Sequence, residues 1–462
     1  MRTLALSMVR VAVAGLALRR SGGDHTGARI AASEVPRALR FFLADGFFAA
    51  GQDAFILAYL PLLVTALGGG PFHVGLLSAS TSLGALMALY PGALISRRAR
   101  SRRWVVVFYA GILGRLLLLG AAMVVAIAEG NAALYAVIGL FTLRAFLGSF
   151  ALPAWTALAA DVIPEHMRSR YFASRNFAMS IATLTITPIG GLLLDFMGFP
   201  GGYVAALGVS FALGMLATVA YARIPEPAPQ REVAARRRVG PLAMARNGPF
   251  RRFVVATFAL HFATMIAGPF FTVHLKNNLG ATNFEVGWLT TASPMAGLAA
   301  MLIGGELQHR RGALWITRGS LLVLPVLPLM WALIDAPWMV LAPNIAGGFI
   351  WAAFNLANFQ LLLEVTPEDE RDEYVAVFHM TVFAALFAAP PAFGVEGDAV
   401  ARARMAADRL STTLRERVMT VMKEKGPAEA VKVCFVEAQK LTAELAQSEK
   451  LSIRPGTRYL PL

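Results

Sequence analysis

Apolar stretches of about 20 residues, separated by short polar loops, recur along most of this chain of 462 residues. An α-helix rises about 1.5 Å per residue, so about 20 apolar residues are needed for a helix to cross the hydrocarbon core of a bilayer. Such stretches predict helices, because helices satisfy their own backbone hydrogen bonds in lipid. The sequence therefore predicts an all-α, polytopic membrane protein with about eleven transmembrane helices. They cover residues 41–67, 72–95, 104–128, 132–160, 171–196, 203–221, 253–275, 284–305, 314–334, 338–363 and 374–394.

The charged residues indicate how these helices are oriented. The chain is 57% hydrophobic and only 15% charged, with a formal net charge of +14. Its arginines cluster in alternate loops, and positive charge in short loops marks the cytoplasmic side of a membrane protein. We therefore expect a multi-pass protein of the cell (inner) membrane with a cytoplasmic N-terminus, and no nucleic-acid partner. The arginines concerned are Arg37, Arg40, Arg97, Arg98, Arg100, Arg102, Arg103, Arg168, Arg170, Arg236, Arg237, Arg238, Arg310 and Arg311.

Three sequence motifs occur twice, in the same order along the chain. LGGGPFHVGLL at residues 67–77 returns as LGATNFEVGWL at 279–289, GALISRRA at 92–99 returns as GELQHRRG at 305–312, and PEHMRSRY at 164–171 returns as PEDERDEY at 367–374. The repeat distance is far longer than the period of a solenoid. The chain is therefore predicted to consist of two homologous bundles of helices.

The repeats define the expected domain boundaries. We assign residues 1–36 to a cytoplasmic N-terminal segment, 37–222 to a six-helix bundle, 223–250 to a basic cytoplasmic linker, 251–394 to an incomplete bundle of about five helices, and 395–462 to a tail. The twelfth span expected from the repeat is missing. The tail carries charges throughout and apolar residues at helical spacing on both sides of Gly426 and Pro427, which predicts a soluble helical hairpin.

The layout and the loop motif resemble the major facilitator superfamily. GELQHRRG is similar to the loop signature G-x-L-x-D-R-x-G of that family, Arg144 and Gly148 are similar to its Arg-Gly pair, and TPIGG at 187–191 is similar to a stretch of its drug/proton antiporters. Ser96 and His309 replace the acidic residue of the loop signature. The resemblance implies two bundles that rock about a site near the midplane of the bilayer. It assigns a gating role to the loop residues Gly92, Arg97, Arg98, Gly305, His309, Arg310, Arg311 and Gly312.

Four ionisable residues inside the predicted spans are candidates for proton coupling. A charged side chain at the bilayer centre costs about 2.5–3.5 kcal/mol on insertion scales, so it is expected to be paired or to face a wet cavity. Asp53 and Arg144 lie near the middle of the first and fourth spans, which line the cavity in the family. Their alternatives are a permanent structural ion pair or two residues that never meet. His261 and His379 either relay protons or form hydrogen bonds between helices.

Three further polar residues of the first and third spans leave alternatives open. Asp45 lies about one turn from the cytoplasmic start of its span, where we expect it to be solvated. Gln52 faces either the cavity or a neighbouring helix. Arg115 needs a partner inside the membrane, for which Asp45 is the candidate.

Aromatic and uncharged polar residues suggest where a substrate binds. A cavity lined by such residues suits an amphipathic small organic molecule, although ordinary helix packing explains the same pattern. The candidates are Gln52, Trp155, Trp351, Asn355, Asn358 and Gln360. The chain shows no nucleophile with a base, no metal cluster and no phosphate-binding loop, so the sequence predicts neither an enzyme nor a cofactor.

The tail leaves a second function open. Its sequence resembles the opening helix of extracytoplasmic haem-binding sensor domains, and eleven spans from a cytoplasmic start would place it outside. Cys434 is the only cysteine, so covalent haem attachment through CxxCH is not expected. One prediction is therefore a transporter of small organic molecules, with proton-coupled efflux as a variant. The alternative is a transport-inactive membrane anchor, or a broken gene fusion, that carries a sensor or interaction tail.

Overall fold

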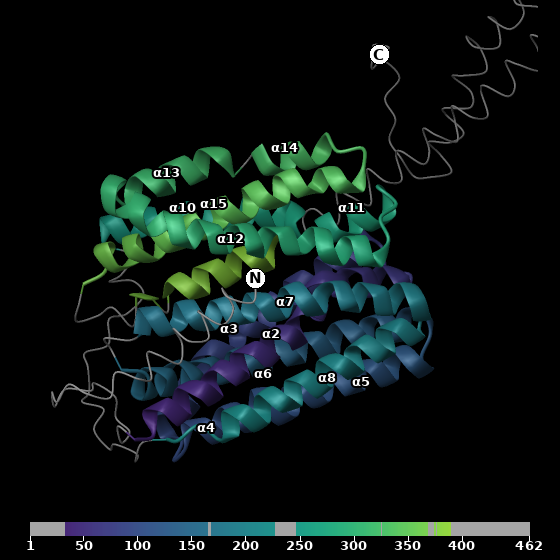
Figure 1. Ribbon diagram of the computed structural model, residues 1–462, viewed down its shortest axis with the longest axis horizontal. Helices are drawn as coiled ribbons and strands as arrows, with labels where there is room; N and C mark the ends of the chain where they lie inside the picture. Colours follow the sequence, from purple (N-terminus) through teal and green to yellow (C-terminus); the bar gives the residue numbers. More distant parts are fainter. Residues whose placement is uncertain are drawn as a thin grey trace, which may run out of the picture. The chain divides into compact units, whose positions relative to one another are not determined.

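A computed structural model describes residues 33–164, 168–226, 246–324, 326–367, 374–375 and 377–389. All regular elements in this part of the chain are helices (Figure 1). These elements form eight continuous helical segments, in the described residues, that are long and apolar enough to cross a membrane. The prediction of an all-α membrane protein is therefore confirmed. Most of the N-terminal segment, most of the linker and the whole predicted tail 395–462 lie outside the described residues.

The N-terminal half contains six of the eight membrane-length helical segments. The third segment is built from three consecutive pieces, of which η1 is a π-helix, and these together run from Arg102 to Ile127. The elements of this half are α2 (Val35–Ala66), α3 (Pro71–Arg98), α4 (Arg102–Val105), η1 (Val106–Leu113), α5 (Gly114–Ile127), α6 (Gly130–Val162), α7 (Arg168–Met197) and α8 (Gly201–Ala222).

The C-terminal half also consists of consecutive helices, but more of them are interrupted. Gly248–Asn277 and Pro337–Leu362 are its two segments of membrane length and hydropathy, and helix Val377–Ala389 is shorter. Most of the described residues in the predicted spans 284–305, 314–334 and 374–394 are helical, but their crossing of the membrane remains a prediction. The elements are α10 (Gly248–Ala267), η3 (Gly268–Phe270), α11 (Phe271–Asn277), α12 (Asn283–Arg311), α13 (Ala313–Val323), α14 (Val326–Ala332), η4 (Pro337–Val340) and α15 (Leu341–Val365).

The repeated motif LGxxxFxVGxL forms the same turn and helix start in both halves. Its second residue is Gly68 before α3 and Gly280 before α12, and both have positive φ values, 87° and 70°. Glycine adopts this left-handed conformation without the steric cost of a Cβ atom. The first turn of each helix is then capped from its own third residue. The Gly70 amide donates to His73 Nδ1 over 3.2 Å, and the Thr282 amide donates to Glu285 Oε2 over 2.8 Å.

Equivalent helix pairs cross closely in the two halves. Helix α3 packs along α6, and α12 packs along α15. Glycines permit the close approach of the backbones. A Cβ atom on Gly92 of α3 would lie 2.2 Å from the Phe150 carbonyl oxygen, and one on Gly348 of α15 would lie 2.0 Å from the Ser293 carbonyl oxygen. The loop-motif glycine at position 92 therefore has a packing role inside the bundle.

Replacing Gly92 by alanine should destabilise the N-terminal half. The new methyl group would collide with the backbone of α6, and overpacking of this kind typically costs about 1–3 kcal/mol. The matched control is Gly148→Ala in α6, where an added Cβ meets nothing within 4 Å. Both changes improve helix propensity equally, so only Gly92→Ala should lower the thermal unfolding temperature of the purified protein in detergent. Equal unfolding temperatures for the two variants would contradict this assignment.

The two halves share one apolar core cluster, at one end of the bundles. It combines Tyr59 and Leu63 of α2 with Val286 and Leu289 of α12 and Val340 of η4. In the described part of the chain, the other four apolar clusters each draw their residues from a single half. We call the end that contains the shared cluster the closed end. The opposite end, where α3 and α12 finish in arginines, is called the arginine-rich end.

Candidate functional site

An ion pair joins the middle of α2 to the middle of α6. Arg144 Nη2 donates a hydrogen bond to Asp53 Oδ1 over 2.6 Å. The Arg144 side chain is 22% exposed and the Asp53 side chain is 47% exposed. Both residues were predicted to lie at mid-span, and the structure brings them together. The packed helices cover the Asp53 carboxylate only in part.

The pair continues into a hydrogen-bonded chain that reaches α5. Gln52 Nε2 donates to Asp53 Oδ1 over 3.0 Å, and Arg115 Nε donates to Gln52 Oε1 over 3.1 Å. Arg115 Nη1 also donates to Thr218 Oγ1 of α8 over 2.6 Å. Gln52 is only 4% exposed, so its amide serves a helix contact. Asp45, the candidate partner of Arg115, accepts none of these hydrogen bonds, which go to Gln52 and Thr218, although the opposite charges of Asp45 and Arg115 still attract each other.

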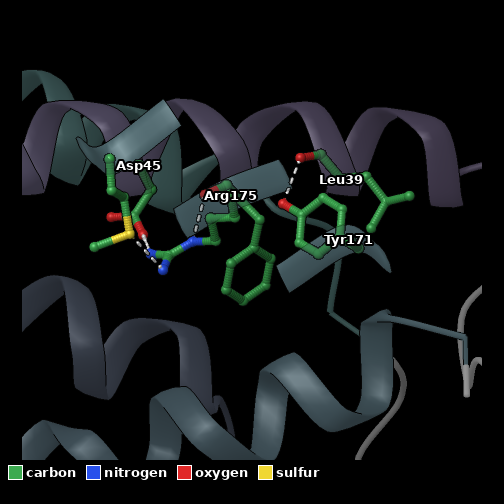
Figure 2. Close-up of polar contacts among 6 residues, drawn as sticks. Leu39, Asp45, Tyr171 and Arg175 are labelled. Carbon is green, nitrogen blue, oxygen red and sulfur yellow. Dashed lines mark hydrogen bonds and ion pairs between the residues drawn. The ribbon is translucent and has the colours of Figure 1, made fainter. Parts of the chain in front are cut away.

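A second ion pair lies deeper in the same half, between α2 and α7 (Figure 2). Arg175 Nη2 lies 3.4 Å from Asp45 Oδ2, and both side chains are only 9% exposed. Arg175 Nε also donates to the Phe42 carbonyl oxygen over 3.3 Å. One turn before Arg175, the Tyr171 hydroxyl donates to the Leu39 carbonyl oxygen over 2.8 Å. The expectation that Asp45 is solvated is therefore wrong, because α7 covers it.

Trp155, a substrate-cavity candidate, packs against this second ion pair. The guanidinium carbon of Arg175 lies 5.3 Å from the centre of the Trp155 ring. The rings of Trp155 and Phe42 also pack nearly at right angles, with their centres 5.9 Å apart. Sequence reasoning missed Arg175. Its position near the start of the apolar stretch 171–196 was the available signal.

Aromatic rings surround His261 in the C-terminal half. His261 Nδ1 lies 2.9 Å from the Thr257 carbonyl oxygen, one turn earlier in α10. The ring centres of Trp351 and Phe354 of α15 lie 5.8 Å and 6.4 Å from the imidazole centre. Two residues predicted separately, His261 and Trp351, are therefore neighbours in one polar and aromatic group.

The remaining candidates of the C-terminal half do not form one cluster. Asn355 is exposed, whereas Asn358 is only 6% exposed. Gln360 lies about half a turn round α15 from Trp351, and its amide donates to Glu364 Oε1 over 2.8 Å. His379 is exposed on the helix 377–389. Asn355 and Asn358 share a face with Trp351, and Gln360 does not.

The loop-motif residues at the arginine-rich end are only partly described. Arg98 and Arg311 are exposed, and Arg311 lies 5.2 Å above the ring of Trp315. Gly312 has a φ of 80°, a value that favours glycine. Gly305 lies within α12. The side chains of Arg97, His309 and Arg310 lie outside those that the structure describes.

Two carboxylates join the elements at the arginine-rich end of the N-terminal half. Asp161 of α6 accepts a hydrogen bond from Arg102 Nη1 over 2.6 Å. Glu226, just after α8, accepts from the Arg102 backbone amide over 2.5 Å and from the Ser101 hydroxyl. These contacts hold the start of α4 to α6 and to the end of α8.

Polar contacts across the closed end join the two halves directly. Asp195 near the end of α7 accepts hydrogen bonds at the start of α12, from Asn283 N over 3.0 Å, Asn283 Nδ2 over 2.7 Å and Phe284 N over 2.8 Å. The hydroxyl of Tyr59, which is fully buried, lies 2.8 Å from the Thr187 carbonyl oxygen and 3.1 Å from that of Asn283. We call these interactions the gate contacts. Sequence reasoning did not identify them.

Comparisons with known proteins agree with this architecture. The family description Major Facilitator Superfamily matches residues 42–390. No curated protein sequence matches the chain.

Solved structures of low sequence identity share the fold. A bacterial homolog to the human lysosomal transporter Spinster, inward-facing and occupied, is 13% identical with a TM-score of 0.64 and covers 91% of this chain and 94% of that one. The nucleoside transporter NupG is 14% identical with a TM-score of 0.60, over 89% and 98%. A bacterial homologue of the iron transporter ferroportin is 15% identical with a TM-score of 0.56, over 78% and 91%. Because the family match also covers most of the sequence, this chain belongs to the Major Facilitator Superfamily and is a transporter rather than an enzyme.

Proposed function

We propose that this protein carries a small organic molecule across the cell membrane by alternating access, and that Asp53 and Arg144 couple the movement to protons. The observation that carries the proposal is their 2.6 Å ion pair at mid-span, in which the carboxylate is nearly half exposed. A charged group at this depth is stable when it is paired and faces a wet cavity. An accessible carboxylate can also exchange its proton with water that enters such a cavity.

The gate contacts support the alternating-access part of the proposal. They join the two halves only through α2, α7 and the start of α12, which all meet at the closed end. In the described residues, each apolar cluster nearer the arginine-rich end belongs to one half. This arrangement suits a state in which the midplane site communicates with the arginine-rich side. With the predicted topology, that side is the cytoplasm.

The direction of transport depends on how the substrate and the proton affect each other. Efflux in exchange for protons, the variant considered from the sequence, requires that substrate and proton compete for the same group. Uptake together with protons requires that each favours binding of the other. The group of His261, Trp351 and Phe354 offers rings for an apolar part of the substrate, and His379 is a further candidate for proton transfer.

Removing either charge of the mid-span pair should abolish proton-coupled movement. The full chain is reconstituted in vesicles, a pH gradient is imposed, and a panel of fluorescent amphipathic compounds is followed. Asp53→Asn keeps the size of the side chain but cannot bind and release a proton, and Arg144→Gln removes its partner. We expect the gradient-driven rate to fall by at least about 10-fold in both variants, since general acid-base groups typically contribute that much or more.

The matched control is Arg102→Gln. It removes another Arg–Asp pair of 2.6 Å that also involves α6, but at the end of the helix. This variant should transport normally. A full chain that moves none of the compounds would contradict the proposal and favour the inactive membrane anchor. Undiminished movement by Asp53→Asn would reject Asp53 as the coupling group.

A further inference from the structure

The interior of the N-terminal half contains one more positive charge than negative charges. Among the described residues of this half, three arginines and two aspartates lie away from the helix ends, and the structure forms two ion pairs from them, Asp45 with Arg175 and Asp53 with Arg144. The fifth residue, Arg115, donates to two neutral groups, Gln52 Oε1 and Thr218 Oγ1. A surplus charge at this depth is costly unless an anion compensates it.

The surplus charge is connected to the accessible ion pair. The Gln52 side chain accepts from Arg115 and donates to Asp53, so a single carboxylate interacts with two guanidinium groups. Arg144 contacts Asp53 through Nη2 alone. A guanidinium carries five N–H donors, and the Arg144 side chain is 22% exposed, so donors remain for a ligand.

These observations indicate which charge the substrate carries. This inference rests on the proposed function. We propose that the substrate is a small organic anion whose acidic group binds Arg144 beside Asp53, and that it travels together with a proton. Arginine is suited to this task because its planar fork binds carboxylates and similar oxyanions through two parallel hydrogen bonds. The anion supplies the negative charge that Arg115, Arg144 and Asp53 lack as a group.

Proton binding and anion binding favour each other at such a site. With Asp53 ionised, the group of Arg115, Arg144 and Asp53 carries a net charge of about +1, and protonation of Asp53 raises it to about +2 and frees Arg144. An anion that binds then restores the balance, and the coupling is reciprocal by thermodynamic linkage. A cationic substrate would instead compete with the proton and produce exchange. The sign of the surplus charge therefore favours symport over the antiport variant.

Other charged groups around Asp53 do not alter this balance. Arg144 of α6 faces it directly, and Arg115 of α5 faces it through Gln52. In the part of the chain that the structure describes, no charged side chain of α3, α7, α11 or α12 contacts Asp53, and α8 contains no Asp, Glu, Lys or Arg. Arg175 of α7 is already paired with Asp45.

Three probe series with aromatic rings and head groups of different charge test the proposal on the purified full chain. The anions are benzoate, benzenesulfonate and naphthalene-2-sulfonate, the cations are the corresponding arylmethyl trimethylammonium ions, and the neutral compounds are the arylmethanols. Thermal stabilisation of the protein in detergent measures binding at pH 6 and at pH 8. We expect the anions alone to stabilise it, and the apparent affinity to be several-fold higher at pH 6.

Three variants separate the roles of the residues. Arg144→Gln should weaken anion binding at least about 10-fold, because it removes the charged donor. Asp53→Asn imitates the protonated carboxyl, so its affinity for anions should be the same at pH 6 and pH 8 and at least as high as that of the unmodified protein. Arg102→Gln should behave like the unmodified protein at both pH values.

Proton movement provides the decisive measurement. Vesicles with a pH-sensitive dye inside receive an inward gradient of benzenesulfonate, which stays ionised and cannot carry a proton itself. Symport predicts acidification of the interior with no imposed pH gradient, and its loss in Asp53→Asn. The anion proposal would be overturned if none of the anions bound. It would also be overturned if the cations bound and their binding weakened at pH 6. Cation transport that depends on Asp53 would leave the proposed transport function intact, whereas no transport by any series would remove that function as well.

Discussion

Replacing Asp195 by alanine is expected to open the closed end of the protein. The Asp195 carboxylate accepts two backbone N–H groups and one side-chain N–H group at the start of α12, so one half of the molecule caps a helix of the other. Caps of this kind typically contribute about 1–2 kcal/mol, and the positive end of the helix dipole adds to the attraction. A loss of about 2 kcal/mol from the closed state would raise the population of the open state by roughly 30-fold.

A cysteine placed in the shared apolar cluster can report this opening. The chain has one cysteine, Cys434, so Cys434→Ser gives a background free of thiols. Ala281 belongs to the cluster and is 1% exposed, so Ala281→Cys should react slowly with a maleimide while the end is closed. Adding Asp195→Ala should raise the labelling rate of the purified protein by about 10-fold or more, because the buried thiol reacts in the open state.

Glu285→Ala provides the matched control for this experiment. Glu285 accepts from the Thr282 amide over 2.8 Å, so it also caps the start of α12, but from within the same half. Its loss weakens the helix start without removing a contact between the halves. Equal acceleration by both variants would show that only local helix stability matters. Unchanged labelling in Asp195→Ala would mean that the apolar cluster and Tyr59 alone keep the end closed.

Replacing Arg175 by glutamine should have the largest effect on stability. It leaves the Asp45 carboxylate, whose side chain is 9% exposed, without its guanidinium partner. Breaking a buried ion pair by removing one partner typically costs about 3–5 kcal/mol. For bundles of this size we expect the thermal unfolding midpoint in detergent to fall by about 10 °C.

A double-mutant cycle distinguishes the unpaired charge from lost packing. Asp45→Asn combined with Arg175→Gln removes the charge that the single change leaves, so the double variant should be more stable than Arg175→Gln alone. Full recovery is not expected, because the contacts of Arg175 with Trp155 and the Phe42 carbonyl are also lost. Arg102→Gln, at an ion pair whose arginine is 33% exposed and whose aspartate is 11% exposed, should lower stability less than Arg175→Gln does. A double variant less stable than the single one would refute the role assigned to the charge.

The buried pair and the gate contacts involve opposite ends of the same helix. Arg175 near the start of α7 binds α2, and Asp195 near its end binds α12 of the other half. Because the pair fixes α7 to α2, opening of the closed end should move α7 with the N-terminal half and break the contacts of Asp195. A helix that is bound firmly to one half, and to the other half through contacts that break on opening, is suited to a gate.

Hydropathy, repeated motifs and the position of charges were enough to predict the class of fold, the duplication and the mid-span pair. Lipid demands that each spanning segment satisfy its own backbone hydrogen bonds, so the length and hydropathy of a stretch predict a helix without knowledge of its neighbours. The repeated motif is local in the same sense, since a glycine turn and a cap formed three residues later lie within one short segment. Asp53 and Arg144 stood out because a charge is costly at that depth.

Which polar groups contact each other could not be predicted before the helices were packed. The Tyr59 hydroxyl reaches a carbonyl 224 positions away, Asp195 caps a helix 88 positions away, and Arg175 is 130 positions from Asp45. These distances depend on the rotation and register of packed helices, which hydropathy leaves undetermined because both faces of a span can be apolar. Arg115 therefore donates its hydrogen bonds to Gln52 and Thr218 and not to Asp45. Asp45 was expected to be solvated, but it is covered by α7.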